Sequence, residues 1–467
     1  MDDFWRKEEK LAWLRENPIS KIAFESIVPD AKHNWINQTD NDWDELIPIA
    51  DKSVKLGRND GAIFELFSLG VVTNRDDWVY DFSQKVLEEK IKFLIDAYNK
   101  DLAVFSKLSK DEINEVIGKR EKREMGEIKW TRAVVNDISH GKVYRFDASH
   151  FMVSTYRPFV KSTIYFAKEL NEMQYQMPHL VGPNRENLFI TFLSGNRQPF
   201  CGLATKYLPN LALYSADPAQ CLPIFRYDPD GTRHDNITDW AVEEFARRGA
   251  SGLTKDDIFH YVYAVLHYPP YREKYEQNLK REFPRIPVYE NALEWARLGK
   301  ELMELHLNYE TVEPFALIQK EVEPMRRKAE TRPVGSVPLL NIDLSTSEED
   351  TLATARVSAF IPKPTTKLRA DKEAGVIEID SHTSLEGIPA SAWEYKLGNR
   401  SALEWVLDQY KERKPKDPTI AEKFNTYKFA DYKDHVIDLL KRVCTVSVKT
   451  MEIVKSMPED PSQNRER

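Results

Sequence analysis

The sequence predicts a mixed α/β (α+β), multidomain protein in which helical segments scaffold a central β-rich block. First, its 467 residues suit about two to four domains, because a domain typically spans about 100–200 residues. Second, the composition is that of a folded chain, with 41% hydrophobic, 30% charged and 11% aromatic residues. Third, strand-like segments concentrate between residues 143 and 227, whereas helical periodicity dominates on both sides.

The chain opens with a leading segment, residues 1–60, which mixes short helical patterns with a polar turn. An apolar run over residues 63–72 then predicts a strand, and Thr73–Asp76 ends it as a polar loop. From Phe82 onward, apolar residues recur at spacings of three and four, which predicts an amphipathic helix with Ser83 as its N-cap.

A polar helical stretch near 107–123 completes a helical and mixed connecting region, which we assign to residues 61–150. Residues 151–325 are expected to form the β-rich block with its helical scaffold. Its strand-like segments are FMVSTYRPF, STIYF, NLFITFL, LALYS and PIFRY, and its helical patterns cover 238–247, 254–267, 271–282 and 291–307.

The C-terminal part starts after residues 326–366, whose Pro, Ser, Thr and charged residues predict a linker or mobile loop. Residues 367–380 predict a hairpin with its turn at 372–375, and apolar spacing predicts a helix over 436–454. Residues 367–467 are therefore expected to form a small C-terminal unit of hairpin and helices.

Charge and cysteine content restrict the class of protein. The net charge of −8 and an isoelectric point near 5.8 argue against a surface covered with basic patches. Charge is uneven, however: between Tyr175 and Arg226 four cations face two acids, so DNA would be tolerated in the central third. Three cysteines, no apolar run of about 18–20 residues and no visible signal peptide predict a cytoplasmic protein without membrane contact.

The chemical motifs of several enzyme classes are absent from the sequence. There is no phosphate-binding GxxxxGK[ST] loop, no GxGxxG, no GxSxG and no Cys/His spacing typical of zinc. His267–Tyr271 (HYPPY) imitates the tetrapeptide of amino-methyltransferases, but Tyr268 cannot accept from an exocyclic amine, so a Pro-Pro turn after a helix is favoured. Asp380 followed by Glu394-Tyr395-Lys396 imitates a metal-dependent nuclease, a spacing that arises easily by chance in an acid-rich chain.

Two polar loops flank the predicted strand Leu188–Leu193. They are Asn184-Arg185-Glu186-Asn187 and Gly195-Asn196-Arg197-Gln198. Arg reads guanine through two hydrogen bonds, and Asn or Gln reads adenine in the same way, so these loops suit the major groove of DNA. The alternative is that they are solvated loops with Asx-turn chemistry.

Several stretches, in order along the chain, resemble one family. They are Thr73–Tyr80, Lys129–Arg132 with Gly141-Lys142, Tyr156–Phe159 with Ile164–Phe166, residues 256–287, Trp393–Tyr395 leading into 401–410, and residues 424–443. Together they resemble the C-terminal specificity region of type ISP restriction-modification enzymes over nearly the whole chain. The ordered set is far more specific than any single stretch.

The resemblance implies sequence-specific recognition of double-stranded DNA in phage defence, without catalysis by this chain alone. The region would position DNA for an N6-adenine methyltransferase and a coupled helicase-nuclease, and residues 1–60 could be the tail of that methyltransferase domain. S-adenosylmethionine, ATP and Mg²⁺ are then expected on the partner domains and none in this chain. Two alternatives stay open: an active adenine methyltransferase or nuclease, and a protein-interaction module that never touches DNA, which the acidic isoelectric point favours.

Under this resemblance, the candidate DNA contacts fall into four groups. Loop residues expected to include base readers are Arg185, Asn187, Asn196, Arg197 and Gln198. Phosphate contacts are expected from Lys161 and Lys206, and Asn74 and Arg75 come from the family-like stretch Thr73–Tyr80. Arg157 and Arg226 could contact phosphates or hold the fold; between Tyr156 and Pro158, Arg157 is expected to be structural.

Overall fold

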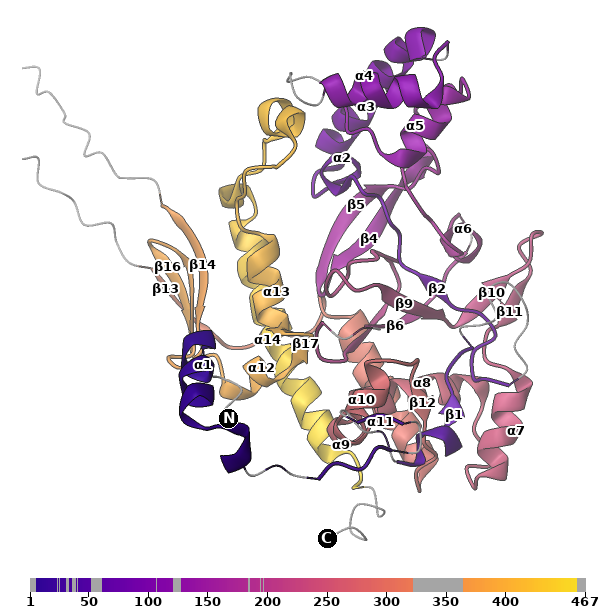
Figure 1. Cartoon of the computed structure of the whole chain (residues 1–467), viewed down its shortest axis with the longest axis vertical. Helices are drawn as coiled ribbons and strands as arrows, with labels where there is room; N and C mark the ends of the chain where they lie inside the picture. Colours follow the sequence, from indigo (N-terminus) through magenta and orange to yellow (C-terminus); the bar gives the residue numbers. More distant parts are fainter. Residues whose placement is uncertain are drawn as a thin grey trace, which may run out of the picture.

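The computed structural model of the chain describes residues 6–22, 24, 26–30, 33–35, 39, 41–51, 61–105, 107–120, 127–183, 185–193, 195, 197–321 and 364–459. These residues fold around three hydrophobic clusters, to which both helices and short sheets contribute (Figure 1). The mixed α/β class predicted from the sequence is confirmed. The leading segment contains α1 (Lys7–Glu16), η1 (Ile19–Lys21) and η2 (Asp42–Glu45).

A group of helices covers one sheet at the top of Figure 1. The helices are α2 (Asp76–Val79), α3 (Gln84–Phe105), α4 (Lys110–Arg120) and α5 (Arg132–Ser139). The sheet has the order β3-β5-β4-β8, with β3 (Tyr80–Asp81), β4 (Phe151–Arg157, after η3, Ala148–His150), β5 (Val160–Tyr165) and β8 (Leu208–Pro209). The predicted helix from Phe82 is confirmed as α3, and Ser83 Oγ accepts from the amide of Val86 at 3.4 Å. The apolar face of α3 packs on this sheet.

A second sheet, ordered β2-β9-β6-β7, lies at the centre. Its strands are β2 (Ser68–Leu69), β6 (Phe189–Leu193), β7 (Gly202–Thr205) and β9 (Ala219–Pro223), and every residue of the last three is buried. Short α6 (Met177–Leu180) precedes β6, and the hairpin β10 (Phe225–Tyr227) to β11 (Arg233–Asp235) follows β9. Full burial explains why these strands are mostly apolar, with Thr191, Thr205 and Gln220 as their buried polar residues.

The predicted scaffold helices lie below this sheet in Figure 1. They are α7 (Asp239–Arg247), α8 (Lys255–His267), α9 (Pro269–Lys274), α10 (Glu276–Leu279) and α11 (Ala292–Leu307), and β1 (Ile47–Pro48) pairs with β12 (Arg285–Ile286). Thr254 caps α8 in a capping box with Asp257. The stretch expected as one helix over 271–282 is instead two short helices, α9 and α10.

The C-terminal part combines a four-stranded antiparallel sheet with helices. The sheet order is β13-β16-β15-β14, with β13 (Ile318–Glu321), β14 (Thr366–Asp371), β15 (Val376–Asp380) and β16 (Thr383–Glu386). Then come α12 (Ala390–Glu394), β17 (Lys396–Leu397), β18 (Arg400–Ser401), α13 (Ala402–Gln409), η4 (Ile420–Phe424), η5 (Phe429–Asp431) and α14 (Lys433–Ser456). The predicted hairpin and final helix are confirmed as β14–β15 and α14. Because α14 buries Val436 in one cluster and Val454 in another, it joins two of the hydrophobic clusters.

Two predicted strands differ from the structure. Of the run 63–72, only Ser68–Leu69 forms a strand, although Phe64, Val71 and Val72 make isolated bridges. Residues 211–215 form turns, in which Asn210 Oδ1 accepts from the amide of Ala212 at 2.8 Å. This local side-chain bond competes with strand pairing. Nearly all of the expected linker 326–366 lies outside the described residues.

The two imitations of catalytic motifs have structural explanations. Pro269 starts α9 directly after α8, which is the expected Pro-Pro turn. Asp380 pairs with Lys433 at 2.7 Å and Glu394 pairs with Lys455 at 3.1 Å, so each carboxylate already has a cation. Over the described ranges, no cluster of His, Cys, Asp or Glu could hold a metal ion. None of the helices described is long and apolar enough to cross a membrane.

Candidate nucleic-acid interface

The two polar loops beside β6 differ in how much of their hydrogen bonding is already used. Asn187 is buried, and its Nδ2 donates to the carbonyls of Leu180 (3.1 Å) and Phe225 (2.9 Å). Its Oδ1 accepts from the amide of Phe225 at 3.2 Å. Arg185 is half-buried and donates from Nη1 to the carbonyl of Pro178 at 3.0 Å. These contacts argue for a structural role of Asn187.

The second loop exposes its arginine. The Arg197 side chain is 66% exposed, with Nε 3.3 Å from Asp217 Oδ1, and its amide donates to Asp217 Oδ2 at 3.2 Å. Gln198 Oε1 accepts from the amide of Asn399, in the turn between β17 and β18, at 3.1 Å. Asn196 lies outside the described residues. Asp217 therefore holds the backbone amide and Nε of Arg197, while most of the side chain, with its guanidinium, stays exposed to solvent.

The candidate phosphate contacts of the block also separate. Lys161 Nζ pairs with Glu310 at 2.5 Å, whereas Lys206 is exposed and has no carboxylate partner in the part of the chain that the structure describes. Arg157 donates from Nη1 to the carbonyl of Tyr156 (2.6 Å) and stacks over the Tyr156 ring at 4.0 Å. Lys206 thus has the geometry expected of a phosphate contact, and Arg157 that of a structural residue.

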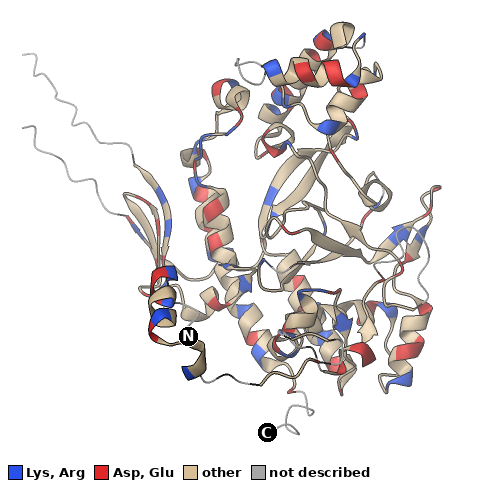
Figure 2. Cartoon of the chain, viewed as in Figure 1, with Lys and Arg blue, Asp and Glu red and all other residues tan. Residues whose placement is uncertain are grey.

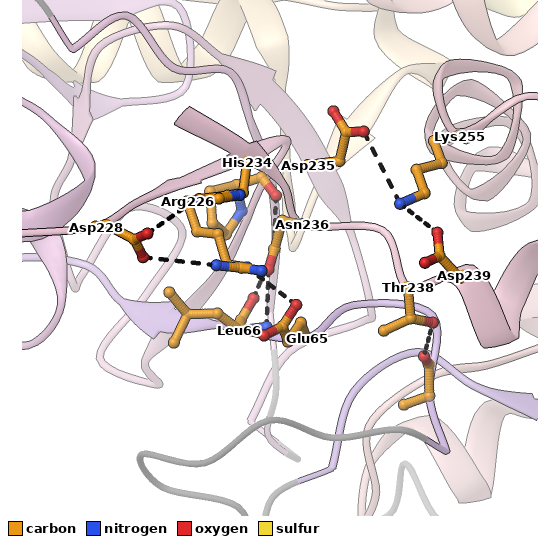
Figure 3. A network of polar contacts seen from close by, with 12 residues as sticks. Glu65, Leu66, Arg226, Asp228, His234, Asp235, Asn236, Thr238, Asp239 and Lys255 are labelled. Atoms are coloured by element: carbon orange, nitrogen blue, oxygen red, sulfur yellow. Dashed lines mark hydrogen bonds and ion pairs between the residues drawn. The ribbon is translucent and has the colours of Figure 1, made fainter. Parts of the chain in front are cut away.

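Arg226 belongs to a polar network that fastens the β10–β11 hairpin (Figure 3). Its Nε pairs with Glu65 Oε2 at 3.0 Å, and Asp228 lies 3.9 Å from Nη1. Next to it Asn236, which is fully buried, accepts from the amide of Leu66 and donates to the carbonyls of Leu66 and Pro223, each at 2.8 Å. The network joins the hairpin to the segment before β2, which favours a structural role for Arg226.

A cleft of about 800 Å³ lies where the segment Thr73–Trp78 meets residues 127–129, 210–212 and 416–419. Asn74 is exposed here in the left-handed conformation (φ 54°), which asparagine tolerates better than most residues. Asp76 accepts from the hydroxyl of Tyr156 at 3.0 Å. Two of the family-like stretches, Thr73–Tyr80 and Tyr156–Phe159, are therefore joined through Asp76, which lines this cleft.

Arg75 lines the same cleft but is only 2% exposed. It donates from Nη2 to Thr131 Oγ1, while Nε and Nη1 have no hydrogen-bond partner among the described residues. Burial lowers the pKa of Arg75 to about 10, which still leaves the guanidinium charged near neutral pH. A buried cation with unused donors is costly, and its depth argues against direct contact with a duplex in this conformation.

The sequence model of the type ISP C-terminal specificity domain family matches residues 62–439. The chain belongs to this family. Three solved structures are similar over almost all of this specificity domain. The structure titled as the DrdV–DNA complex shares 44% identity at a TM-score of 0.82, covering 98% of this chain and 43% of that one.

The second is a nuclease-deletion mutant of the type ISP restriction-modification enzyme LlaGI in complex with a DNA substrate mimic. It shares 27% identity at a TM-score of 0.74, over 98% of this chain and 32% of that one. The ATP-dependent type ISP enzyme LlaBIII, bound to DNA, has the same fold at 24% identity and a TM-score of 0.75, over 97% of this chain and 27% of that one. No match was found among curated proteins.

The cleft of the specificity domain lies entirely inside the matched range, and its far wall comes from the C-terminal part. Asp417 Oδ2 accepts from Trp78 Nε1 at 2.7 Å, and Thr419 Oγ1 donates to the carbonyl of Glu127 at 2.6 Å. The motifs noted in the sequence include neither this wall nor the basic residues 411–416, of which Lys416 lines the cleft. The signal of this basic stretch was present as four cations and one acid in six residues.

Proposed function

We propose that this specificity domain recognises a short sequence in double-stranded DNA within a type ISP-like restriction-modification system. The observation that carries the proposal is the similarity to the DrdV–DNA complex, at 44% identity over 98% of this chain. The LlaGI structure, also a complex with a DNA substrate mimic, supports it at 27% identity. Because the similarity covers 98% of this chain, we infer that a DNA-binding surface in the matched part of DrdV would also be present here.

We infer the partner domains of this chain from the share of each related chain that it covers. It spans 43% of the DrdV chain and 32% of the LlaGI chain. We place the adenine methyltransferase and the helicase-nuclease on the remaining parts, together with S-adenosylmethionine, ATP and Mg²⁺. Exposed apolar side chains in the leading segment, such as Ile19, Phe24 and Trp35, support a neighbouring domain that covers them.

Within the domain, the accessible groups are the best candidates for contact with DNA. Arg197 offers an exposed fork for a guanine edge, and Lys206 offers an unpaired charge for a phosphate. Gln198, Arg185 and Asn74 are partly or fully exposed and could contact DNA after small side-chain movements. Asn187 and Arg75 would act by holding the recognition loops and the cleft in shape.

The proposal is tested by selecting duplexes from a randomised library with the full chain and then measuring affinity as a function of salt. We expect one enriched sequence, and a log–log salt slope close to −0.9 per phosphate contact. A shuffled duplex of equal length is the control. Binding without sequence enrichment, or no binding in low salt, would contradict the proposal and favour a protein-interaction module.

Catalysis by the chain alone is tested separately. Incubation with labelled S-adenosylmethionine, or with ATP, in the presence of the selected duplex should give only background turnover, because we assign both cofactors to the partner domains. Activity that co-purifies with the chain and survives dialysis would support the alternative of an active methyltransferase or nuclease.

A further inference from the structure

The segment that joins α13 to η4 has an unusual charge pattern. Residues 411–416 read Lys-Glu-Arg-Lys-Pro-Lys, and every one except Pro415 is exposed. Arg413 pairs with Asp408 at 2.5 Å. Lys411, Lys414 and Lys416, in contrast, have no carboxylate within ion-pair distance among the residues described. Figure 2 shows these cations along the loop that continues from α13.

The acids of this segment are occupied by the fold rather than by the lysines. Glu412 Oε1 accepts from the amide of Phe429 at 2.9 Å. Asp417 accepts from Trp78 Nε1 (2.7 Å) and from the amides of Thr419 (3.0 Å) and Ile420 (3.1 Å). The carboxylates thus fix the backbone of the segment, and the three lysines are left with uncompensated charge.

The hydrogen bond from Trp78 to Asp417 holds the C-terminal end of this segment beside the cleft at Thr73–Trp78. Lys416 lines the cleft, and so does Lys129, which is exposed and likewise has no carboxylate partner among the described residues. Three cations (Arg75, Lys129 and Lys416) and four carboxylates (Asp76, Asp77, Glu127 and Asp417) line the cleft, and of these Lys129, Lys416 and Asp77 are exposed. We call Lys129, Lys411, Lys414 and Lys416 the basic rim.

Uncompensated like charges within a Debye length of about 8–10 Å repel one another, and an anionic partner relieves that repulsion. Residues 411–416 span at most about 18 Å when extended, which along a duplex is the rise of about five nucleotides of one strand. Regularly spaced phosphates suit such an array of point charges. Since Pro415 and the bonds to Asp417 already order the segment, little entropy is lost on binding.

We propose that the basic rim binds the phosphates of one DNA strand beside the cleft. This inference rests on the proposed function and adds a set of contacts that lies outside the β-rich block. Phosphate contacts carry no base information, so the basic rim would set affinity and position, while loops such as Gly195–Gln198 set the sequence.

The test is the triple variant Lys411→Ala, Lys414→Ala, Lys416→Ala of the full chain. We expect the log–log salt slope to flatten by about 0.9 for each lost contact. Over a fourfold change in salt, the unmodified chain should then lose affinity on the order of 40-fold more than the variant. Selected and shuffled duplexes should weaken by the same factor.

Two comparisons make the outcome decisive. The matched control, Lys300→Ala, Lys441→Ala, Lys449→Ala, removes three lysines from α11 and α14 and should leave the slope unchanged. The triple Lys→Arg variant at 411, 414 and 416 keeps the charge and should restore it. One contrary outcome is that the unmodified chain binds DNA while the triple Ala variant keeps both its Tm and the full salt slope. In that case the basic rim does not bind phosphates, and the proposed function stands. If the unmodified chain does not bind DNA at all, the proposed function itself fails.

Discussion

Three candidate cations of the β-rich block differ from the lysines of the basic rim in how their charge is compensated. In the block, Lys161, Arg197 and Arg226 each lie within 3.3 Å of a carboxylate oxygen. In the rim, three neighbouring lysines have none among the described residues, because the local acids bind backbone amides and an indole. An excess of cations in a stretch of sequence therefore does not mean that those cations lack ion-pair partners in the fold. Of the cations counted between Tyr175 and Arg226, Arg226 pairs with Glu65, which lies outside that stretch, and Arg197 pairs with Asp217 inside it.

The largest expected effect separates the two regions by stability. Asn236→Leu should destabilise the domain by about 3 kcal/mol or more, since two backbone carbonyls and one amide lose their buried partner at roughly 1–3 kcal/mol each. The salt slope of DNA binding by the folded variant should not change. Urea denaturation measures the free energy of unfolding, and salt titration measures the salt slope of DNA binding. A flattened salt slope in Asn236→Leu would contradict the assignment of Asn236 to stability alone.

The second prediction concerns how the free energy of unfolding depends on pH through two buried histidines, His267 and His306. Burial lowers the pKa of His306 to about 3 and that of His267 well below its usual value, so both are neutral in the fold. The unfolded chain binds protons more readily below pH 6.5, so the free energy of unfolding should fall as pH drops from 6.5. The loss should be about 1.4 kcal/mol per pH unit for each histidine.

The variant His306→Gln keeps a donor and an acceptor for Tyr263 and Thr450 but removes one titration. Its stability should therefore depend less steeply on pH between 7 and 5 in urea titrations. His140→Gln, at an exposed position, is the matched control. Equal pH dependence in His306→Gln and the unmodified chain would show that His306 does not resist protonation.

The third prediction concerns base recognition by a compensated cation. Arg197→Ala should cost about 1–3 kcal/mol at a single base pair of the selected sequence. Arg197→Lys keeps the charge without the fork, so it should lose the same preference and keep the salt slope. Arg247→Ala, an exposed and ion-paired arginine on α7, is the control. Uniform weakening on all sequences would make Arg197 a phosphate contact instead.

The smallest effects distinguish a free lysine from a fixed arginine within the block. Lys206→Ala should flatten the salt slope by about one unit and leave Tm unchanged. Arg157→Ala should lower stability by about 1 kcal/mol and leave the slope alone, because Arg157 donates to Tyr156 and to Asn210 Oδ1 (3.3 Å). Side-by-side measurement of Tm and slope decides the matter, and exchanged outcomes would reverse the two roles.

Patterns in the sequence were enough to predict the family, the mixed α/β class and the elements with strong local periodicity, such as α3, α14 and the β14–β15 hairpin. The family was predicted from stretches ordered along nearly the whole chain, whereas the individual elements depend on local spacings of a few residues. The strand expected at 211–215 was wrong because the Asn210 side chain bonds the backbone locally, a competition that apolar content does not reveal.

The tertiary structure alone decided which polar groups are free. Gln198 meets Asn399 across 201 residues, and Trp78 meets Asp417 across 339. No local pattern encodes such contacts, because compensation of a charge depends on which carboxylate the fold brings within a few ångströms. For the same reason Arg75, a candidate DNA contact in a stretch expected to form a polar loop, proved to be buried. The sequence therefore limits which side chains are chemically suited to contact DNA, and packing decides which of those side chains stay exposed and unpaired.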